Sequence, residues 1–492
     1  MKKLTELIKT LTYTNIIGYT DIDIFSIEQD SRECKAGSLF VAIRGTNSDG
    51  HKYIENVIRQ GTKVIVCEEI PTINDKNITF IMVDNSRLAL AELAHTWYNF
   101  PTREMKVIGI TGTNGKTTIT FLIKSILDSI GEKAAIIGTT GIYIGNQKLP
   151  ATHTTPGPLQ LCSYLSQMKS EGVKYVVMEV SSHALSQNRV SGISFDVAAF
   201  TNLTHDHLDY HTTMEDYASA KKQLFQMLSP DGIAVVNGDD DYSEFILKDI
   251  KTSRKIKVGR KSGNDIIIAD EKLNLDGSDF MLKINSNELM NIKTGLLGRF
   301  NIDNAAMAVA ICLQLGFDKN AIIEILKTSA GAPGRMQKII LKNKAIAMVD
   351  YAHTPDALEK ALNSCREALV SAGLKNNKLL CVFGCGGDRD KTKRPIMGKI
   401  SSSLADFTIL TDDNPRTEDS SKIIQDIYYG IENGEKMKVI QISNRAEAIA
   451  YAYSISAESD IIIVAGKGHE TYQILGEVKH HFDDYEVLMK FV

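Results

Sequence analysis

The sequence TGTNGKTT, residues 111–118, constrains the fold of this 492-residue chain more than any other stretch. It follows the apolar run 107–110 and precedes residues 119–130, where apolar side chains recur at helical spacing. A strand, a glycine-rich turn and a helix in this order predict a phosphate-binding loop, because backbone N–H groups and the helix N-terminus then face the anion. The common pattern has a further glycine where this chain has Ile110, so the loop is a G-x-x-G-K-T variant.

The residue types inside this loop suit a nucleotide. Gly112 and Gly115 allow the backbone to turn tightly and to aim N–H groups at phosphate oxygens. Lys116 can reach the terminal phosphates, and the Thr117 hydroxyl can ligate a magnesium ion. We therefore expect ATP and Mg²⁺ as the cofactors.

Composition excludes several classes of protein. The net charge of −4, from 56 basic and 60 acidic residues, gives no overall attraction to nucleic acid or to an anionic membrane. No apolar run reaches the length of a membrane span, and the N-terminus lacks the apolar core of a signal peptide. The seven cysteines show no zinc-ligand spacing, and Cys381 and Cys385 lie in an apolar run that indicates buried thiols. We expect a cytoplasmic monomer with small-molecule partners only.

Short apolar runs alternate with helical segments along the chain, which predicts an α/β fold in three domains. Residues 1–104 are predicted to form a small α/β domain. Residues 105–334 are predicted to form a central domain whose mostly parallel sheet carries helices on both faces, and residues 335–492 a Rossmann-like domain. The strands predicted in the two larger domains are 107–110, 134–137, 175–180, 195–200, 233–236, 345–349, 379–383, 407–410, 439–442 and 461–464.

Polar residues of the central domain cluster after predicted strands, where ligands of such folds bind. Glu179 ends one strand and could hold the magnesium ion of ATP. His207 lies in a polar run after another strand, and Lys221 follows on a helix beside Lys222. Two adjacent lysines on a helix are most often solvated, so this pair alone indicates little.

The third domain has its own polar loops after strands, and the facing loops of two such domains predict a cleft for two substrates. Residues 384–394 form a glycine-rich loop with several cations that suits a carboxylate or a phosphate. Arg416 offers a planar fork for a carboxylate, and Glu470 could take an ammonium group. Together these loops indicate a small zwitterionic substrate.

Nine motifs, in order along the whole chain, resemble those of the Mur ligase family, and among its members the MurE type. They are TGTNGKTT, MEVSSH (178–183), HDHLDYH (205–211), GRFNIDN (298–304), PGRM (333–336), DYAHTPD (350–356), GGDRDKTKRP (386–395), DDNPR (412–416) and AGKGHE (465–470). The resemblance implies an ATP-dependent amide ligase of peptidoglycan synthesis. ATP would phosphorylate the γ-carboxylate of D-glutamate in UDP-N-acetylmuramoyl-L-alanyl-D-glutamate, and the amine of an incoming amino acid would attack the acyl phosphate.

The resemblance also assigns roles to residues at matching positions. Those matching the nucleotide site are Gly112, Thr113, Asn114, Gly115, Lys116, Thr117, Thr118, Asn301, Arg335, Asp350 and His353. Those matching metal ligands are Thr117, Glu179, His207 and Lys221, and the catalytic set is Lys116, Glu179, His207 and Lys221. Lys221 matches the carbamylated lysine of the family, N6-carboxylysine, with Lys222 as a competing candidate.

Two further groups match the substrate sites of the family. The UDP-muramoyl-dipeptide group is Gln29, Ser31, Thr46, Asn47, Ser48, His153, Thr154, Thr155, Ser181, Gln187 and Arg189, with the first five in the amino-terminal domain. The amino-acid group matches the pocket for meso-diaminopimelate and is Arg389, Asp413, Asn414, Pro415, Arg416, Gly466 and Glu470.

The charges of the pocket support the amino acid that the resemblance implies. Diaminopimelate carries a carboxylate and an ammonium at its far end, and Arg416 complements that carboxylate. L-Lysine ends in an ammonium alone, which a desolvated arginine would repel. The alternatives are a lysine-adding or folylpolyglutamate-type ligase, and, in another class, a nucleotide-driven regulatory binding protein. We also expect the third domain to rotate about a hinge near residues 331–334, since its loops must meet the phosphate loop.

Overall fold

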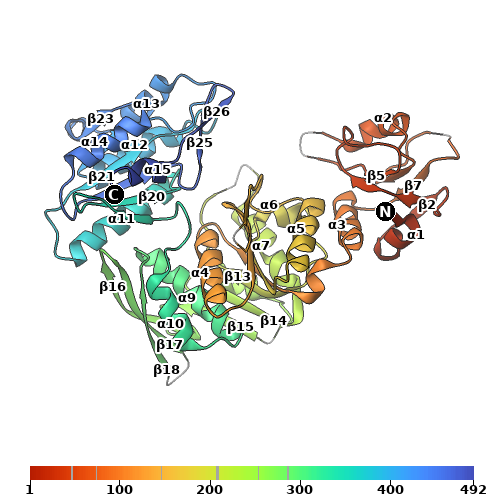
Figure 1. Cartoon of the computed structure of the whole chain (residues 1–492), viewed down its shortest axis with the longest axis horizontal. Coiled ribbons are helices and arrows are strands. Elements are labelled where there is room, and N and C mark those ends of the chain that lie inside the picture. Colours follow the sequence, from red (N-terminus) through yellow and green to blue (C-terminus); the bar gives the residue numbers. More distant parts are fainter. Residues whose placement is uncertain (46–47, 74, 146, 207–209, 253, 285–287) are drawn as a thin grey trace. The chain divides into compact units, whose positions relative to one another are not determined.

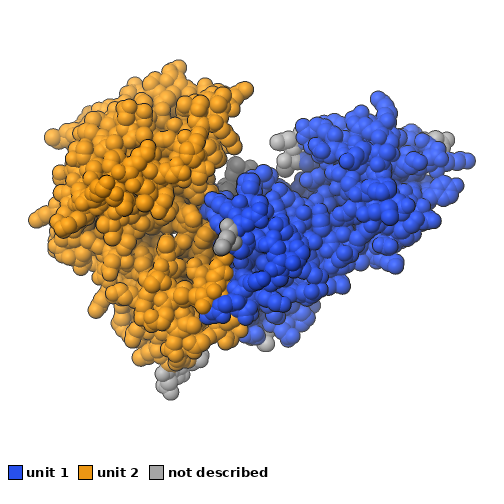
Figure 2. All heavy atoms as spheres, in the orientation of Figure 1, with its two compact units in different colours: residues 1–116, 130–256 blue, residues 117–129, 257–492 orange. Residues whose placement is uncertain are grey.

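The computed structural model describes residues 1–45, 48–73, 75–145, 147–206, 210–252, 254–284 and 288–492 (Figure 1). The chain forms two compact units (Figure 2). The first unit comprises residues 1–116 and 130–256, and the second comprises residues 117–129 and 257–492. In the described residues, no helix is long and apolar enough to cross a bilayer.

The first unit begins with a small, mostly parallel sheet in the order β2-β7-β6-β5-β4, in which only β2 is antiparallel to its neighbour. Its central strands are apolar runs buried along their whole length, as expected for strands covered on both faces. The elements are β1 (Lys2–Lys3), α1 (Leu4–Leu7), β2 (Asn15–Ile17), β3 (Asp23–Ile24), β4 (Ser26–Glu28), β5 (Ser38–Val41), α2 (Ile54–Arg59), β6 (Val64–Cys67), β7 (Thr79–Met82) and α3 (Ser86–Trp97).

The same unit continues with the larger sheet that carries the phosphate loop. The strands of this sheet run in the order β11-β10-β9-β12-β8-β13-β14 and continue through β15, β16, β17 and β18; β9, β12, β8, β13 and β14 are parallel. The elements are β8 (Lys106–Thr111), β9 (Ala134–Gly138), β10 (Gly141–Ile144), β11 (Gln147–Leu149), α5 (Pro158–Ser170), β12 (Tyr175–Glu179), α6 (Ser182–Ser186), β13 (Phe195–Phe200), α7 (Met214–Gln226), β14 (Leu228–Asn237) and α8 (Ser243–Leu247). The helix α4 (Lys116–Ser129) follows β8, and from Thr117 on it groups with the second unit.

The second unit contains an antiparallel meander followed by two helices. The strands β16, β17 and β18 pair in register over most of their length, and β15 runs parallel to β16. The elements are β15 (Arg254–Gly259), whose first three residues group with the first unit, β16 (Ile266–Asn274), β17 (Gly277–Ile284), β18 (Glu288–Thr294), α9 (Arg299–Gln314) and α10 (Lys319–Thr328).

The carboxyl-terminal part of this unit is a sheet in the order β19-β20-β24-β21-β22-β23, in which only β19 is antiparallel. Alternate residues of its strands enter two cores: α11, α12 and α13 contribute to one, and α14 and α15 to the other, which makes three layers. The elements are β19 (Gln337–Ile340), β20 (Ile346–Asp350), α11 (Pro355–Ser371), β21 (Leu379–Phe383), α12 (Lys393–Leu404), β22 (Phe407–Leu410), α13 (Ser420–Tyr429), β23 (Val439–Gln441), α14 (Arg445–Ile455), β24 (Ile461–Ala465), β25 (Tyr472–Leu475), β26 (Val478–His481) and α15 (Asp484–Met489).

The α/β class, the separate sheets and their mostly parallel strands agree with the prediction from sequence. The meander β16–β18 and the hairpin β25–β26 were not predicted, because these strands are only partly buried and so lack long apolar runs. The described cysteines are all buried and free, as expected for structural thiols. The domain boundaries at residues 104 and 334 stay predictions.

Candidate functional site

The phosphate loop turns between β8 and α4, and its shape depends on glycine. Gly112 has φ +145°, and a Cβ atom there would lie 1.8 Å from the Thr201 hydroxyl oxygen. Gly115 also has positive φ, +88°. No other residue type allows the backbone to pass this close to the end of β13.

Residues that follow β13 brace the loop from the neighbouring strand. The backbone N–H of Thr113 donates to the Asn202 carbonyl oxygen at 2.9 Å. The backbone N–H of Asn114 donates to the Asn202 side-chain oxygen, also at 2.9 Å. The Thr201 hydroxyl donates to the Asn114 carbonyl at 2.5 Å. The loop is therefore held in shape by the parallel pairing of β8 with β13. Sequence reasoning gave Thr201 no role of its own, although Thr201 begins the polar run 201–207 that follows a predicted strand.

Lys116 folds back over its own loop. Its Nζ donates to the carbonyl oxygens of Gly112 at 2.8 Å and Thr113 at 2.9 Å. An ammonium at this point places a positive charge where the glycine backbone leaves room for an anion. Thr117 and Thr118 are buried at the start of α4, with Thr117 accepting a hydrogen bond from Thr120 through its carbonyl oxygen at 2.7 Å.

Glu179 ends β12 beside the strand that leads into the phosphate loop, in register with Ile110. Its carboxylate is buried and accepts the N–H of Thr139 at 2.9 Å and the hydroxyl of Thr139 at 3.1 Å. A Cβ atom on Gly138 would lie 2.3 Å from Oε1, so a glycine makes room for this acid. A buried carboxylate at the end of the strand beside this loop suits a divalent cation.

Lys221 is buried on α7, with its Nζ 4.2 Å from the centre of the Tyr217 ring. Desolvation, and then the charge of Lys116, hold the pKa of Lys221 well below its usual value, whereas the charge of Asp206 opposes this. Lys222 instead lies against Phe245 with its Nζ 4.9 Å from the ring centre. His207 lies outside the described residues. In the described residues, three or more His, Cys, Asp or Glu side chains nowhere gather as a ready metal site.

The predicted dipeptide residues of the central sheet lie together beside Glu179. The hydroxyls of Thr139 and Thr154 are 3.0 Å apart, and Thr155 donates to the Glu179 carbonyl at 2.8 Å. Arg189 donates to the Thr155 carbonyl at 2.9 Å.

The remaining members of this group join the same cluster. The N–H of Ser181 donates to the Thr155 hydroxyl at 3.1 Å, and the Gln187 side-chain oxygen accepts from Arg189 at 2.7 Å. Burial, and then the charge of Arg189, lower the pKa of His153, whose Nδ1 lies 3.1 Å from the Thr152 hydroxyl oxygen. A guanidinium next to hydroxyl groups suits an anionic substrate.

The described members of this group in the amino-terminal domain lie in loops. Gln29 and Ser31 follow β4, and Ser48 lies near the Tyr53 hydroxyl at 3.3 Å. Thr46 and Asn47 lie outside the described residues.

In the second unit, three motifs that are distant in sequence meet. Gly334 packs on the loop after β24, because a Cβ atom on it would lie 2.1 Å from the backbone nitrogen of His469. The Arg335 guanidinium lies 4.6 Å from the centre of the Tyr351 ring, and the Tyr351 and His469 rings lie 5.0 Å apart between centres, tilted by 45°. Desolvation raises the pKa of Asp350, and Arg335 opposes this.

Two more predicted nucleotide residues lie in this unit. The centre of the His353 ring lies 4.6 Å from that of Tyr351. The His353 carbonyl oxygen accepts a hydrogen bond from Lys393 Nζ at 2.9 Å. Asn301 is buried in α9, where it donates to Leu297 at 2.9 Å and accepts from Asn304 at 3.1 Å. The hydrogen bonds of the Asn301 amide are thus made within its own segment.

The predicted amino-acid pocket is formed by the loops after β21, β22 and β24. Asn414 donates to Glu470 at 2.9 Å and accepts from the fully buried Lys467 at 3.2 Å. Gly466 has φ +114°, and a Cβ atom there would lie 2.6 Å from the Asp413 carboxylate. These contacts join the second and third loops of the pocket.

The cations of the pocket differ in exposure. The Nη1 of Arg416 donates to the Gly387 carbonyl at 2.7 Å, and in the described residues its Nε and Nη2 donate to no acceptor. Arg389 is exposed and Pro415 is buried. A half-exposed guanidinium with donors to spare is what a carboxylate ligand requires.

Two buried arginines support this pocket. Arg394 was predicted as one of the ligand-binding cations of the loop 384–394, whereas sequence reasoning gave Arg445 no role. Arg394 donates to Glu418 and to Asp426, each at 2.9 Å. Arg445 forms a fully buried ion pair with Asp484 at 2.7 Å, and it also donates to carbonyls at the ends of β22 and β24. Their partners lie far along the chain, so no local signal marks them.

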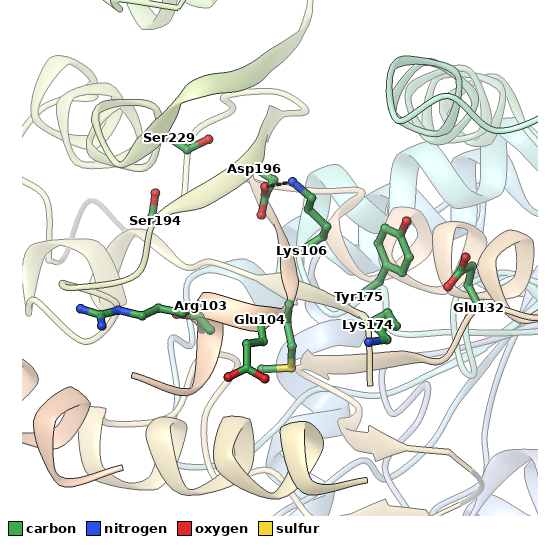
Figure 3. A pocket seen from close by; sticks show the side chains of 11 residues that line it. Arg103, Glu104, Lys106, Glu132, Lys174, Tyr175, Ser194, Asp196 and Ser229 are labelled. Carbon is green, nitrogen blue, oxygen red and sulfur yellow. Dashed lines mark hydrogen bonds and ion pairs between the residues drawn. The ribbon is translucent and has the colours of Figure 1, made fainter. Parts of the chain in front are cut away.

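A hollow of about 620 Å³ lies at the opposite, amino-terminal ends of β8, β12 and β13 (Figure 3). Lys106 and Asp196 in it pair at 2.7 Å, and Glu104 pairs with Lys169 at 2.7 Å. Ligands of parallel sheets bind at the other edge, so this hollow is not the candidate site.

Family models match most of the chain. The model described as the Mur ligase middle domain matches residues 110–312, the one described as Mur ligase, glutamate ligase domain matches residues 334–468, and the one described as Mur ligase family, catalytic domain matches residues 23–98. The UDP-N-acetylmuramoyl-L-alanyl-D-glutamate–2,6-diaminopimelate ligase of Clostridium tetani is 43% identical over 100% of this chain and 99% of its own. The chain belongs to the Mur ligase family.

Further comparisons agree with this assignment. The enzyme of the same name from Syntrophomonas wolfei is 42% identical over 99% of this chain and 98% of its own. A solved structure of a UDP-N-acetylmuramoyl-L-alanyl-D-glutamate–2,6-diaminopimelate ligase is 32% identical, with a TM-score of 0.72 over 99% of this chain and 98% of that one. A folylpolyglutamate synthase of Mycobacterium tuberculosis, 17% identical with a TM-score of 0.62, shares the fold over 77% of this chain and 92% of its own.

Proposed function

We propose that this Mur ligase joins meso-diaminopimelate to the D-glutamate of UDP-N-acetylmuramoyl-L-alanyl-D-glutamate, with hydrolysis of ATP, in peptidoglycan synthesis. Relatives named UDP-N-acetylmuramoyl-L-alanyl-D-glutamate–2,6-diaminopimelate ligase are about 40% identical over essentially the whole chain. The observation that carries the choice of amino acid is Arg416, whose Nε and Nη2 have no acceptor among the described residues.

The reaction needs two anions brought together. ATP transfers its γ-phosphoryl group to the substrate carboxylate, which forms an acyl phosphate and ADP; the amine then attacks the carbonyl carbon, and phosphate leaves as a proton is lost. The glycine turn at Gly112 and Gly115 supports a role in holding the triphosphate, and the Lys116 ammonium would screen the charge between the two anions. The remaining nucleotide candidates, including Thr113, Asn114 and Thr118, are proposed on their place in this loop.

Mg²⁺ is proposed as the metal, held by Thr117, Glu179, His207 and Lys221. Bound there, it would neutralise charge on the phosphate oxygens. The buried Glu179 carboxylate and the glycine that makes room for it fit a hard cation. A lysine of low pKa can react with CO₂ as the neutral amine, so the environment of Lys221 supports carbamylation there.

The pocket residues have distinct proposed tasks. Arg416 would bind the distal carboxylate of diaminopimelate, and Asp413 and Glu470 would bind its ammonium. The cluster around Arg189 would bind the muramoyl-dipeptide. L-Lysine lacks the distal carboxylate, so it would leave the Arg416 guanidinium desolvated and unpaired.

The test is phosphate release from ATP with the UDP-muramoyl-dipeptide present, adding meso-diaminopimelate or L-lysine in turn. Release is expected with meso-diaminopimelate and not with L-lysine. Equal release with both would indicate a lysine-tolerant ligase. Release that needs neither amino acid would indicate a nucleotide-driven binding protein.

A further inference from the structure

Arg416, the residue proposed to bind the distal carboxylate, has an unusual backbone conformation. Its φ is +54°, in the left-handed region that residues other than glycine rarely adopt. Such a conformation is unfavourable and persists only where the surrounding structure holds it. Because the backbone sets the direction of a side chain, whatever holds this conformation also aims the guanidinium.

The element that holds it is the hairpin β25–β26. The N–H of Arg416 donates to the Ile474 carbonyl at 3.1 Å, and the N–H of Gly476 donates to the Arg416 carbonyl at 2.8 Å. Arg416 and Leu475 form a parallel bridge through these bonds. Both backbone hydrogen-bonding groups of Arg416 are therefore taken by the hairpin.

The hairpin also fixes the two residues that precede the buried Pro415. The Gln473 side-chain nitrogen donates to the Asp413 carbonyl at 2.8 Å. The N–H of Ile474 donates to the Asn414 side-chain oxygen at 3.0 Å. Asn414 is the residue that in turn contacts Lys467 and Glu470, so the hairpin reaches the second half of the pocket as well.

The hairpin is not part of the main sheet of this unit. It forms a two-stranded sheet of its own, separate from the six-stranded sheet, and β26 is exposed along its length. A two-stranded hairpin is only marginally stable by itself, so its bonds to residues 413–416 stabilise hairpin and loop together.

We propose that the hairpin β25–β26 is a positioning element that aims Arg416 and Asn414 and so sets selection for an amino acid with a distal carboxylate. Gln473 and Gly476 are its positioning residues. This inference rests on the proposed function, because it concerns the same pocket.

Gly476 offers a matched pair of variants. Its φ is +61°, and nothing lies within 4 Å of a Cβ atom placed on it, so a substitution there changes only the backbone preference. Asparagine tolerates this conformation and valine does not. Gly476→Asn is therefore expected to keep the hairpin turn, and Gly476→Val to displace the Gly476 N–H from Arg416.

Gln473 offers a second pair. Gln473→Glu keeps the size of the side chain and turns the donor that faces the Asp413 carbonyl into an acceptor. His480 is its exposed register partner on β26, so His480→Glu adds the same charge to the same hairpin without touching the loop.

The experiment measures kcat and KM for meso-diaminopimelate, L-lysine, ATP and the UDP-muramoyl-dipeptide in all four variants. Gly476→Val and Gln473→Glu are expected to raise KM for meso-diaminopimelate about 10-fold, the size of one lost hydrogen bond at a charged ligand, and to lower the preference over L-lysine by a similar factor. KM for ATP and for the dipeptide should stay within about 2-fold, and Gly476→Asn and His480→Glu should match the wild type.

Two results would overturn the inference. One is an unchanged preference for meso-diaminopimelate in both Gly476→Val and Gln473→Glu. The other is a loss that affects all substrates alike, which would indicate a general structural role. If instead the wild type used neither amino acid, the proposed function itself would fail, and this inference with it.

Discussion

The phosphate loop and the amino-acid pocket are built in contrasting ways. The groups proposed to hold the triphosphate come from one stretch of eight residues, 111–118, whose shape rests on two glycines of positive φ and on bonds to one neighbouring strand. The pocket takes its groups from three loops and holds them with buried charges, Lys467, Arg394 and the pair Arg445–Asp484. An anion can be held by backbone N–H groups of a single turn, whereas a two-ended amino acid needs opposite charges from separate segments.

The largest expected effect is on the loop side. Lys116→Met should lower kcat for phosphate release by about 1000-fold, because it removes the ammonium that screens the reacting anions. Lys124→Met is the control, since Lys124 lies on the same helix and pairs with Asp128. Near-normal turnover of Lys116→Met in the same assay would show that the chemistry does not depend on the loop.

The next effect concerns the charges beneath the pocket. Arg445→Met should lower the free energy of unfolding by about 3–5 kcal/mol, because it leaves the Asp484 carboxylate buried and unpaired. The double variant Arg445→Met, Asp484→Leu should regain part of the loss. Lys399→Met, which breaks the exposed pair with Glu432, should cost less than about 1 kcal/mol in the same denaturant titration. Equal losses from the buried and exposed pairs would remove the contrast between the two regions.

A glycine substitution tests the loop through its backbone. Gly112→Ala should lower the free energy of unfolding by about 2–4 kcal/mol and weaken ATP binding, because its Cβ atom would meet the Thr201 hydroxyl at 1.8 Å. Gly131→Ala is a matched control: its φ is +83° and its surroundings are open, so only about 1 kcal/mol should be lost. Similar losses for both variants would mean that the close approach to Thr201 is unimportant.

The smallest effect depends on pH. Hydrogen bonds from Arg394, and then from Lys391, lower the pKa of Glu418 from 4.5 to about 2. A carboxyl with a lowered pKa stabilises the fold above its unfolded pKa, and this stability is lost as the pH falls through 4.5 toward 2. The stability difference between wild type and Glu418→Gln should therefore be about 1–2 kcal/mol at pH 6 and shrink by pH 3. A difference that stays constant over this range would contradict the ion pair.

The same contrast explains what could be predicted from sequence. The loop was recognisable because its residues are contiguous, and Arg416 because a proline stiffens its motif. The buried ion pair beneath the pocket was not recognisable, because Arg445 and Asp484 are 39 positions apart and only the folded sheet brings them together. The hairpin that holds Arg416 carried a weak signal, the turn at Gly476, which an analysis of apolar runs passes over.

The most direct test offers the enzyme equal concentrations of meso-diaminopimelate and L-lysine, with ATP and the UDP-muramoyl-dipeptide, and identifies the product by mass spectrometry. The expected product carries meso-diaminopimelate alone, and Arg416→Met should yield less of it relative to the lysine product. A wild-type product that carries lysine, or no amide product at all while ATP is hydrolysed, would contradict the central claim that Arg416 selects the amino acid joined to D-glutamate.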